Sequence, residues 1–168
     1  CRQIIERHHG TIRADAPEAG GTLVTFTLPL ATPSVMFVAA CHAAQEEAEY
    51  EDGQYGLMYL APDPLVPHEE SGRMRQAELV LRRSTHRGDQ FVWLDDQALL
   101  IIAVADRAGL RAMVERLAQV LERASLPVRM SSALYPVDGA SPERLLEAAR
   151  TRFFEHAWAG HATMSATR

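Results

Sequence analysis

The sequence lacks several features that mark particular classes of protein. Its 168 residues include only two cysteines, Cys1 and Cys41, which are too few for a disulfide framework or a cysteine-ligated zinc site. No apolar run approaches the roughly 20 residues of a membrane-spanning helix, and no signal-peptide pattern is present. These absences predict a cytoplasmic protein with reduced thiols and no membrane contact.

Basic residues are also scarce. The chain has 17 Lys and Arg against 22 Asp and Glu, a formal net charge of −5. Because binding to a phosphate backbone needs a basic face, this balance argues against a nucleic-acid partner. Hydrophobic residues, in contrast, make up 47% of the chain, which is enough for a real core. The length fits one ordinary domain, or a small domain with a remnant of another.

The first thirty residues predict the end of a helix followed by a β-hairpin. Ile4 and Ile5 give the helix its apolar side, and "TIRADAP" is a short strand that Pro17 ends. "GGTLVTFTLPL" alternates as a strand does, with Gly20 and Gly21 forming the turn before it. A helix fragment and two strands bury little surface alone, so we expect this segment to be part of a larger domain.

The pattern "ERHHGTIRADAP" followed by "GGTLVTFTLPL" resembles the C-terminal end of the ATP-binding domain of sensor histidine kinases. The resemblance implies that residues 1–31 are the remnant of such a domain, with Gly21 and Thr22 at the Gly-Thr step near the nucleotide. The family's asparagine box and two glycine-rich boxes, which hold Mg-ATP, are not present. We therefore expect no cofactor on this chain; ATP and Mg are implied for the parent kinase only.

Residues 32–54 predict a linker that contains a connecting helix. Pro33 marks its beginning, "FVAACHAAQEEAEYEDGQ" has helical composition, and Gly53 ends it. His42 and Glu46 have the spacing of a metal-binding pair on a helix. Since no third ligand is apparent, a solvated helix face is the better interpretation.

The remaining sequence predicts an α/β sandwich with element order β-α-β-β-α-β-α over residues 55–161 and a flexible tail over 162–168. The acidic pair Asp95-Asp96 separates two apolar runs and so predicts a hairpin. Ser141 and Pro142 predict the start of the last helix. The expected strands are 55–62, 90–94, 98–105 and 127–136, and the expected helices are 73–88, 108–126 and 142–159.

Two stretches, "HRGDQFVWLDDQALLIIAVADRAGLRAMVERLAQVL" and "MSSALYPVDGASPERLLEAA", resemble the GGDEF domain of diguanylate cyclases. The resemblance implies the nucleotidyl-cyclase-like fold, but in a degenerate form. Aspartates expected at the end of the first strand fall on Ala61 and Asp63. In the inhibitory Arg-x-x-Asp site, Asp89 is kept and Arg87 is displaced by one position, in the run His86, Arg87, Gly88, Asp89. The signature itself falls on Asp95, Asp96, Gln97, Ala98 and Leu99.

Two alternatives for these polar residues stay open at this point. Asp63, Asp95 and Asp96 are a weak candidate for a rebuilt metal site, because two-metal phosphoryl transfer needs several acids that converge beside a phosphate cradle. An ordinary acidic turn is favoured, so no metal is expected. Three arginines could contact a nucleotide phosphate, although a solvated helix end explains them equally well. They are Arg82, Arg83 and Arg87.

The leading hypothesis is a non-catalytic signalling or regulatory domain, for dimerisation or ligand sensing, in a two-component sensor histidine kinase. Its expected partners are the rest of the kinase chain, a second copy and the response regulator of the phosphorelay. The alternative is a nucleotide- or cyclic-dinucleotide-binding domain or a residual diguanylate cyclase. A third hypothesis is a docking module that uses Phe153, Phe154 and Trp158, although helical spacing favours core or dimer contacts for these aromatics.

Overall fold

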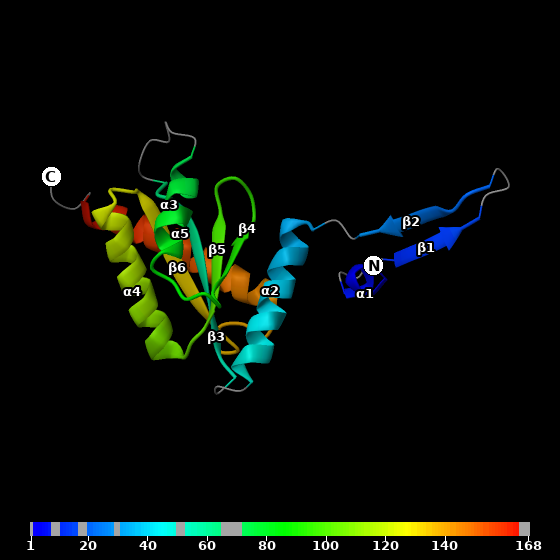
Figure 1. The fold of residues 1–168 in the computed structure, drawn as a ribbon. Coiled ribbons are helices and arrows are strands. Elements are labelled where there is room, and N and C mark those ends of the chain that lie inside the picture. Colours follow the sequence, from blue (N-terminus) through cyan, green and yellow to red (C-terminus); the bar gives the residue numbers. More distant parts are fainter. Residues whose placement is uncertain are drawn as a thin grey trace. The chain divides into compact units, whose positions relative to one another are not determined.

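The computed structural model describes residues 2–7, 11–16, 20–28, 31–49, 53–64 and 72–164. The chain divides into two compact units, Cys1–Thr32 and Pro33–Arg168 (Figure 1). Within the described residues, no helix is long and apolar enough to cross a membrane.

The first unit contains a short helix and a two-stranded antiparallel sheet. Helix α1 spans Arg2–Arg7, and strands β1 (Thr11–Asp15) and β2 (Leu23–Thr27) pair so that Thr11 lies opposite Thr27. Gly20 and Gly21 precede β2 with positive φ angles of 81° and 88°, which suits glycine. The predicted helix and hairpin are confirmed. Their apolar side chains are largely exposed, so the described residues of this unit form no buried core.

The second unit is built around a four-stranded antiparallel sheet with the order β4-β5-β3-β6. From β3 onward, the elements follow the predicted order β-α-β-β-α-β-α. The elements in chain order are α2 (Pro33–Ala48), β3 (Tyr55–Pro62), α3 (Arg73–Arg82), β4 (Gln90–Trp93), β5 (Leu99–Val104), α4 (Arg107–Arg123), β6 (Val128–Tyr135) and α5 (Pro142–Met164).

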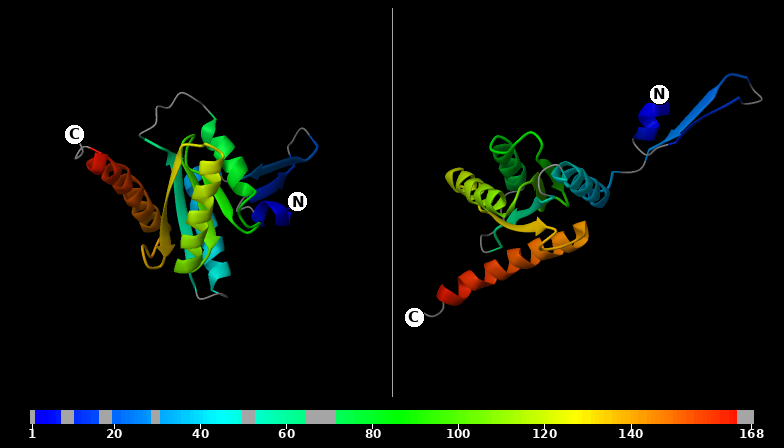
Figure 2. Two further views of the ribbon diagram at one scale, coloured as in Figure 1. Left: turned by 90° about the vertical axis from the view of Figure 1, so that its left-hand side faces the viewer. Right: turned by 90° about the horizontal axis from the view of Figure 1, so that it is seen from below.

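Helices cover both faces of this sheet (Figure 2). Leu57 of β3 packs with side chains of α2 and α5 on one face, whereas its neighbour Met58 packs with α3 and α4 on the other. Successive side chains of a strand point to opposite faces. The two central strands are therefore apolar along nearly their whole length, because neither face meets water.

Helix α2 belongs to this second unit, which begins at Pro33, whereas the sequence predicts that the domain begins at residue 55 and that residues 32–54 are a linker. Phe37 and Cys41 of α2 are buried against the sheet, at 4% and 0% exposure. The helix ends at Ala48, whose carbonyl oxygen accepts a hydrogen bond from the amide of Gly53 at 2.8 Å. The helix is thus a layer of the domain and not a connection outside it.

The predicted hairpin and the start of the last helix are confirmed. β4 pairs antiparallel with β5, with Trp93 opposite Leu99 and the acidic pair in the turn between them. Helix α5 begins at Pro142, and the amide of Arg144 donates to the Ser141 hydroxyl at 3.4 Å.

Gly139 allows the loop after β6 to pass close to the first turn of α5. A Cβ atom at this position would lie 2.6 Å from the backbone nitrogen of Leu145 and 2.8 Å from the carbonyl carbon of Arg144. Both atoms belong to the backbone of a helix, which cannot move away as the end of a flexible side chain can. A glycine is therefore required by packing.

We expect Gly139→Ala to lower the free energy of unfolding by about 2 kcal/mol, the usual cost of forcing an extra methyl group into a packed site. Gly88→Ala is the matched control, because a Cβ there would meet only the Glu47 Oε1 atom, at 3.8 Å. Urea unfolding followed by circular dichroism would measure both variants. Equal stability of the two would contradict this account of Gly139.

Candidate functional site

The β4–β5 turn carries Asp95 to Leu99, where the sequence predicts the position of the cyclase signature, and Asp95 holds it closed. The Oδ1 atom of Asp95 accepts hydrogen bonds from the backbone amides of Gln97 and Ala98, both at 2.8 Å. The amide of Leu94 donates to the Ala98 carbonyl at 2.9 Å. A carboxylate that accepts from the amides two and three residues ahead is a common way to stabilise a turn.

The structure brings Asp63 to the same end of the sheet as this turn. Leu60 of β3 lies opposite Leu99 of β5, so the residue just after β3 and the residues just before β5 are neighbours along the sheet end. The Asp63 carboxylate lies 3.8 Å from the guanidinium of Arg129, and both side chains are about a quarter exposed. This cation balances the charge of Asp63.

The remaining carboxylate of the turn, Asp96, is exposed to solvent. Within the part of the chain that the structure describes, no three His, Cys, Asp or Glu side chains gather as a metal site would require. His42 and Glu46 likewise lie exposed on α2, with no third ligand among the described residues. The acidic turn is thus held by protein groups at Asp95, and the acids near it do not form a metal cluster.

The segment for which the sequence predicts a degenerate inhibitory site forms a closed turn of its own. The amide of His86 donates to Asp89 Oδ2 at 2.8 Å, and the amide of Asp89 donates to the His86 carbonyl at 3.2 Å. Arg87 and Gly88 lie exposed at the tip. The retained aspartate therefore stabilises the loop that leads into β4.

The three arginines at and after the end of α3 differ in their contacts. Arg82 donates to Glu78 at 2.8 Å and lies over the ring of Phe91, 4.2 Å from its centroid. Arg83 and Arg87 are exposed. Arg82 thus packs α3 against β4, which favours a structural role for this residue over contact with a nucleotide phosphate.

An ion pair that the sequence does not predict lies at the other end of the sheet. Asp138 and Arg152 form a bidentate ion pair. Arg152 Nη1 donates to Asp138 Oδ2 at 2.9 Å, and Arg152 Nη2 donates to Asp138 Oδ1. The same carboxylate accepts from the amide of Leu134 at 2.8 Å. The hydrogen bonds from Arg152 lower the pKa of Asp138 below its usual value. No local pattern joins the two residues, because they belong to a loop and a helix 14 residues apart.

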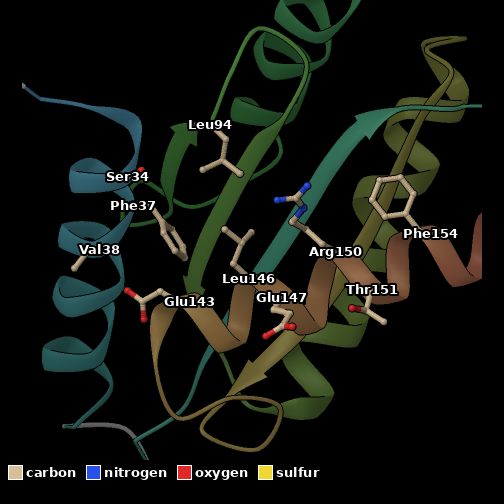
Figure 3. A pocket seen from close by; sticks show the side chains of 10 residues that line it. All are labelled: Ser34, Phe37, Val38, Leu94, Glu143, Leu146, Glu147, Arg150, Thr151 and Phe154. Atoms are coloured by element: carbon tan, nitrogen blue, oxygen red, sulfur yellow. The ribbon is translucent and has the colours of Figure 1, made fainter.

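An open cleft of about 460 Å³ lies between α2 and α5, beside the end of β4. Figure 3 shows Phe37 of α2 and Leu146 of α5 on its apolar floor, with Glu143 and Arg150 among the charged residues around it. Phe154 lines the cleft and is 45% exposed. Phe153, in contrast, is buried and meets Tyr59 edge to face, so it is a core residue. The side chain of Trp158 lies outside the described residues.

No protein-family model and no curated protein matches the chain. Solved structures do resemble it. The GGDEF domain of YfiN from Pseudomonas aeruginosa superposes with a TM-score of 0.60 at 13% identity, covering 73% of this chain and 88% of that one. A sensory box/GGDEF family protein from Caulobacter crescentus gives 0.57 at 14% identity, with coverage of 71% and 88%. A DGC protein from Thermotoga maritima gives 0.55 at 15% identity, with coverage of 68% and 89%. At these identities the likeness shows the fold: the second unit has the mixed α/β fold of GGDEF domains.

We expect Asp95→Ala to lower the free energy of unfolding by about 1 to 2 kcal/mol, because two amides lose a charged acceptor. Asp96→Ala is the matched control, since its exposed carboxylate makes no hydrogen bond in the turn, and a change within about 0.5 kcal/mol is expected. Thermal unfolding would compare the two. If addition of Mn²⁺ stabilised the parent chain but neither variant, the acids would form a metal site after all.

Proposed function

We propose that residues 33–168 are a degenerate, non-catalytic GGDEF domain that regulates a sensor histidine kinase. The observation that carries the proposal is the β4–β5 turn. The positions that resemble the cyclase signature hold Gln97 and Ala98 in place of acids, and Asp95 bonds to their backbone amides. The carboxylate of Asp95 stabilises the turn through these hydrogen bonds and is therefore not free to bind a metal.

Cyclic di-GMP synthesis makes demands that this turn does not meet. Two GTP molecules must be held in apposed sites, and each site must use metal to ionise a hydroxyl and to neutralise triphosphate charge. Gln97 and Ala98 offer neither a carboxylate ligand nor a base. Asp63, another acid at this end of the sheet, is paired with Arg129.

The first unit supports the kinase context. Its hairpin leaves Leu23, Val24 and Phe26 more than half exposed, although these are residues that proteins usually cover. A hairpin at the end of a larger ATP-binding domain would have that cover. The division at Thr32 then separates a kinase part from a regulatory part.

Regulation in this proposal means dimerisation or ligand sensing by the second unit. The cleft between α2 and α5 supports the sensing role, because its size and apolar floor are typical of small-molecule sites. Helix α2 begins at the boundary with the first unit and also lines this cleft through Ser34 and Phe37. A ligand there would contact the helix that follows the kinase part.

We expect no cyclic di-GMP from GTP with Mg²⁺ or Mn²⁺. Loss of metal ligands and charge stabilisation together should cost several kcal/mol of barrier, and each 1.4 kcal/mol is about tenfold in rate. Chromatography of long incubations, beside an active diguanylate cyclase as positive control, would measure this. Product that disappears in both Asp63→Ala and Asp96→Ala would show a rebuilt metal site and overturn the non-catalytic assignment.

The regulatory role is tested on the full-length protein that contains this chain. We expect a version that ends at Thr32 to keep histidine autophosphorylation but to change its initial rate at least about fivefold, the lower end of usual coupling between sites. Asp96→Ala in the full-length protein is the control and should leave the rate unchanged. An unchanged rate, dimer content and phosphotransfer after truncation would contradict regulation, whereas a parent without glycine-rich nucleotide boxes would contradict the kinase assignment.

A further inference from the structure

Strand β6 forms one edge of the four-stranded sheet and is eight residues long, from Val128 to Tyr135 (Figure 1). It pairs with β3 on one side, and no described strand pairs with it on the other. A long edge strand presents a row of backbone donors and acceptors that another strand can use. Some of these groups in β6 are already occupied by hydrogen bonds within the domain.

Hydrogen bonds identify the residues whose backbone faces outward. The amide of Leu134 donates to the Asp138 carboxylate at 2.8 Å, and the Leu134 carbonyl accepts from the amide of Asp138 at 2.8 Å. Arg152 donates to the carbonyl of Ser132 at 2.8 Å. In an antiparallel strand alternate residues face the same side, so Val128, Met130, Ser132 and Leu134 face outward.

These contacts occupy the outward backbone groups at the Leu134 end of β6 and leave outward groups from Val128 to Ser132 unoccupied. We call this part of the edge, Val128 to Ser132, the window. At the beginning of the strand, the Val128 amide bonds to the Leu126 carbonyl at 2.8 Å. Four outward groups then have no hydrogen-bond partner among the described residues. They are the Val128 carbonyl, the Met130 amide, the Met130 carbonyl and the Ser132 amide.

We propose that this window pairs with the same window of a second copy, through a two-fold axis at Met130. Antiparallel pairing about that axis places Met130 opposite its own copy, so its amide and carbonyl exchange two hydrogen bonds. It also places Val128 opposite Ser132 of the partner. The free Val128 carbonyl of each copy then accepts a hydrogen bond from the free Ser132 amide of the other copy. The Val128 amide and the Ser132 carbonyl, which are already occupied, are not needed for this pairing.

The four free groups therefore fit one register. A shift toward Leu134 would bring the partner strand against backbone groups that Asp138 and Arg152 already use. The Asp138–Arg152 pair thus limits the pairing to the window. The half-buried side chains of Val128 and Met130 lie on the face that α3 and α4 cover, and they gain apolar contact across the axis. On the opposite face, the charge of Arg129 is balanced by Asp63.

The pairing joins two sheets into one continuous sheet and depends on β6 and not on the cleft or the β4–β5 turn, so it can fail while the proposed regulatory function holds. Sedimentation velocity of the 168-residue chain, from micromolar to hundreds of micromolar, should show a reversible dimer. Met130→Pro removes one donor from each copy and should weaken the dimer at least tenfold, an effect of about 1.4 kcal/mol. Proline is tolerated on an edge strand where the amide faces outward.

Met130→Leu is the matched control, because it keeps the amide and should dimerise as the parent chain does. Amide hydrogen exchange provides a second measurement if Met130→Pro does not fold. The amides of Met130 and Ser132 should gain protection as the concentration rises, whereas that of Leu134 should be protected throughout by Asp138.

Three results would overturn the proposal. A chain that stays monomeric at all concentrations, or a Met130→Pro dimer as strong as that of the parent, would exclude pairing at this window. Protection of the Met130 and Ser132 amides in the monomer would show that another segment of the same chain covers the edge.

Discussion

The two-sided burial of the central strands is the constraint on which the rest of the second unit depends. Tyr55 to Leu60 of β3 and Leu99 to Ala103 of β5 are buried along their whole length, whichever face each side chain points to. Apolar surface of this kind must be covered on both faces, at roughly 25 cal/mol for each Å² removed from water. The pair α3 and α4 covers one face, and the pair α2 and α5 covers the other.

This constraint bears on why the sequence predicts the helix of α2 but not its place as a layer of the domain. A continuous apolar strand indicates that both faces of the sheet are covered, but it does not indicate which segments of the chain cover them. Helix α2 packs largely through small residues, Ala40, Cys41 and Ala44, between other apolar and small residues such as Val38 and Ala39. It therefore shows no distinct apolar stripe. Helix α4, with Leu110, Leu117 and Leu121 buried on one side, was predicted closely because it does.

The candidate site was predictable where its interactions are local. The hairpin follows from two apolar runs around Asp95-Asp96, and the role of Asp95 in the turn reaches only three residues along the chain. The Asp138–Arg152 pair could not be predicted in this way, because it depends on how α5 lies against β6. Sequence shows which residues can form an ion pair, whereas the fold decides which of them meet.

Fold and chemistry make separate demands on the same turn. The sheet requires only that β4 and β5 be joined by a closed turn, and Asp95 meets that requirement through two backbone amides. A phosphate or metal site would need the opposite: carboxylates free of protein partners, and small residues that allow a ligand to approach the backbone. In this turn, Asp95 bonds to backbone amides, and Gln97 and Leu99 carry large side chains. The turn therefore meets the requirement of the sheet but not that of a phosphate or metal site. Under the proposed function, the core keeps the GGDEF fold without the chemistry, and the domain acts through surfaces that the core leaves open, such as the α2–α5 cleft and the β6 edge.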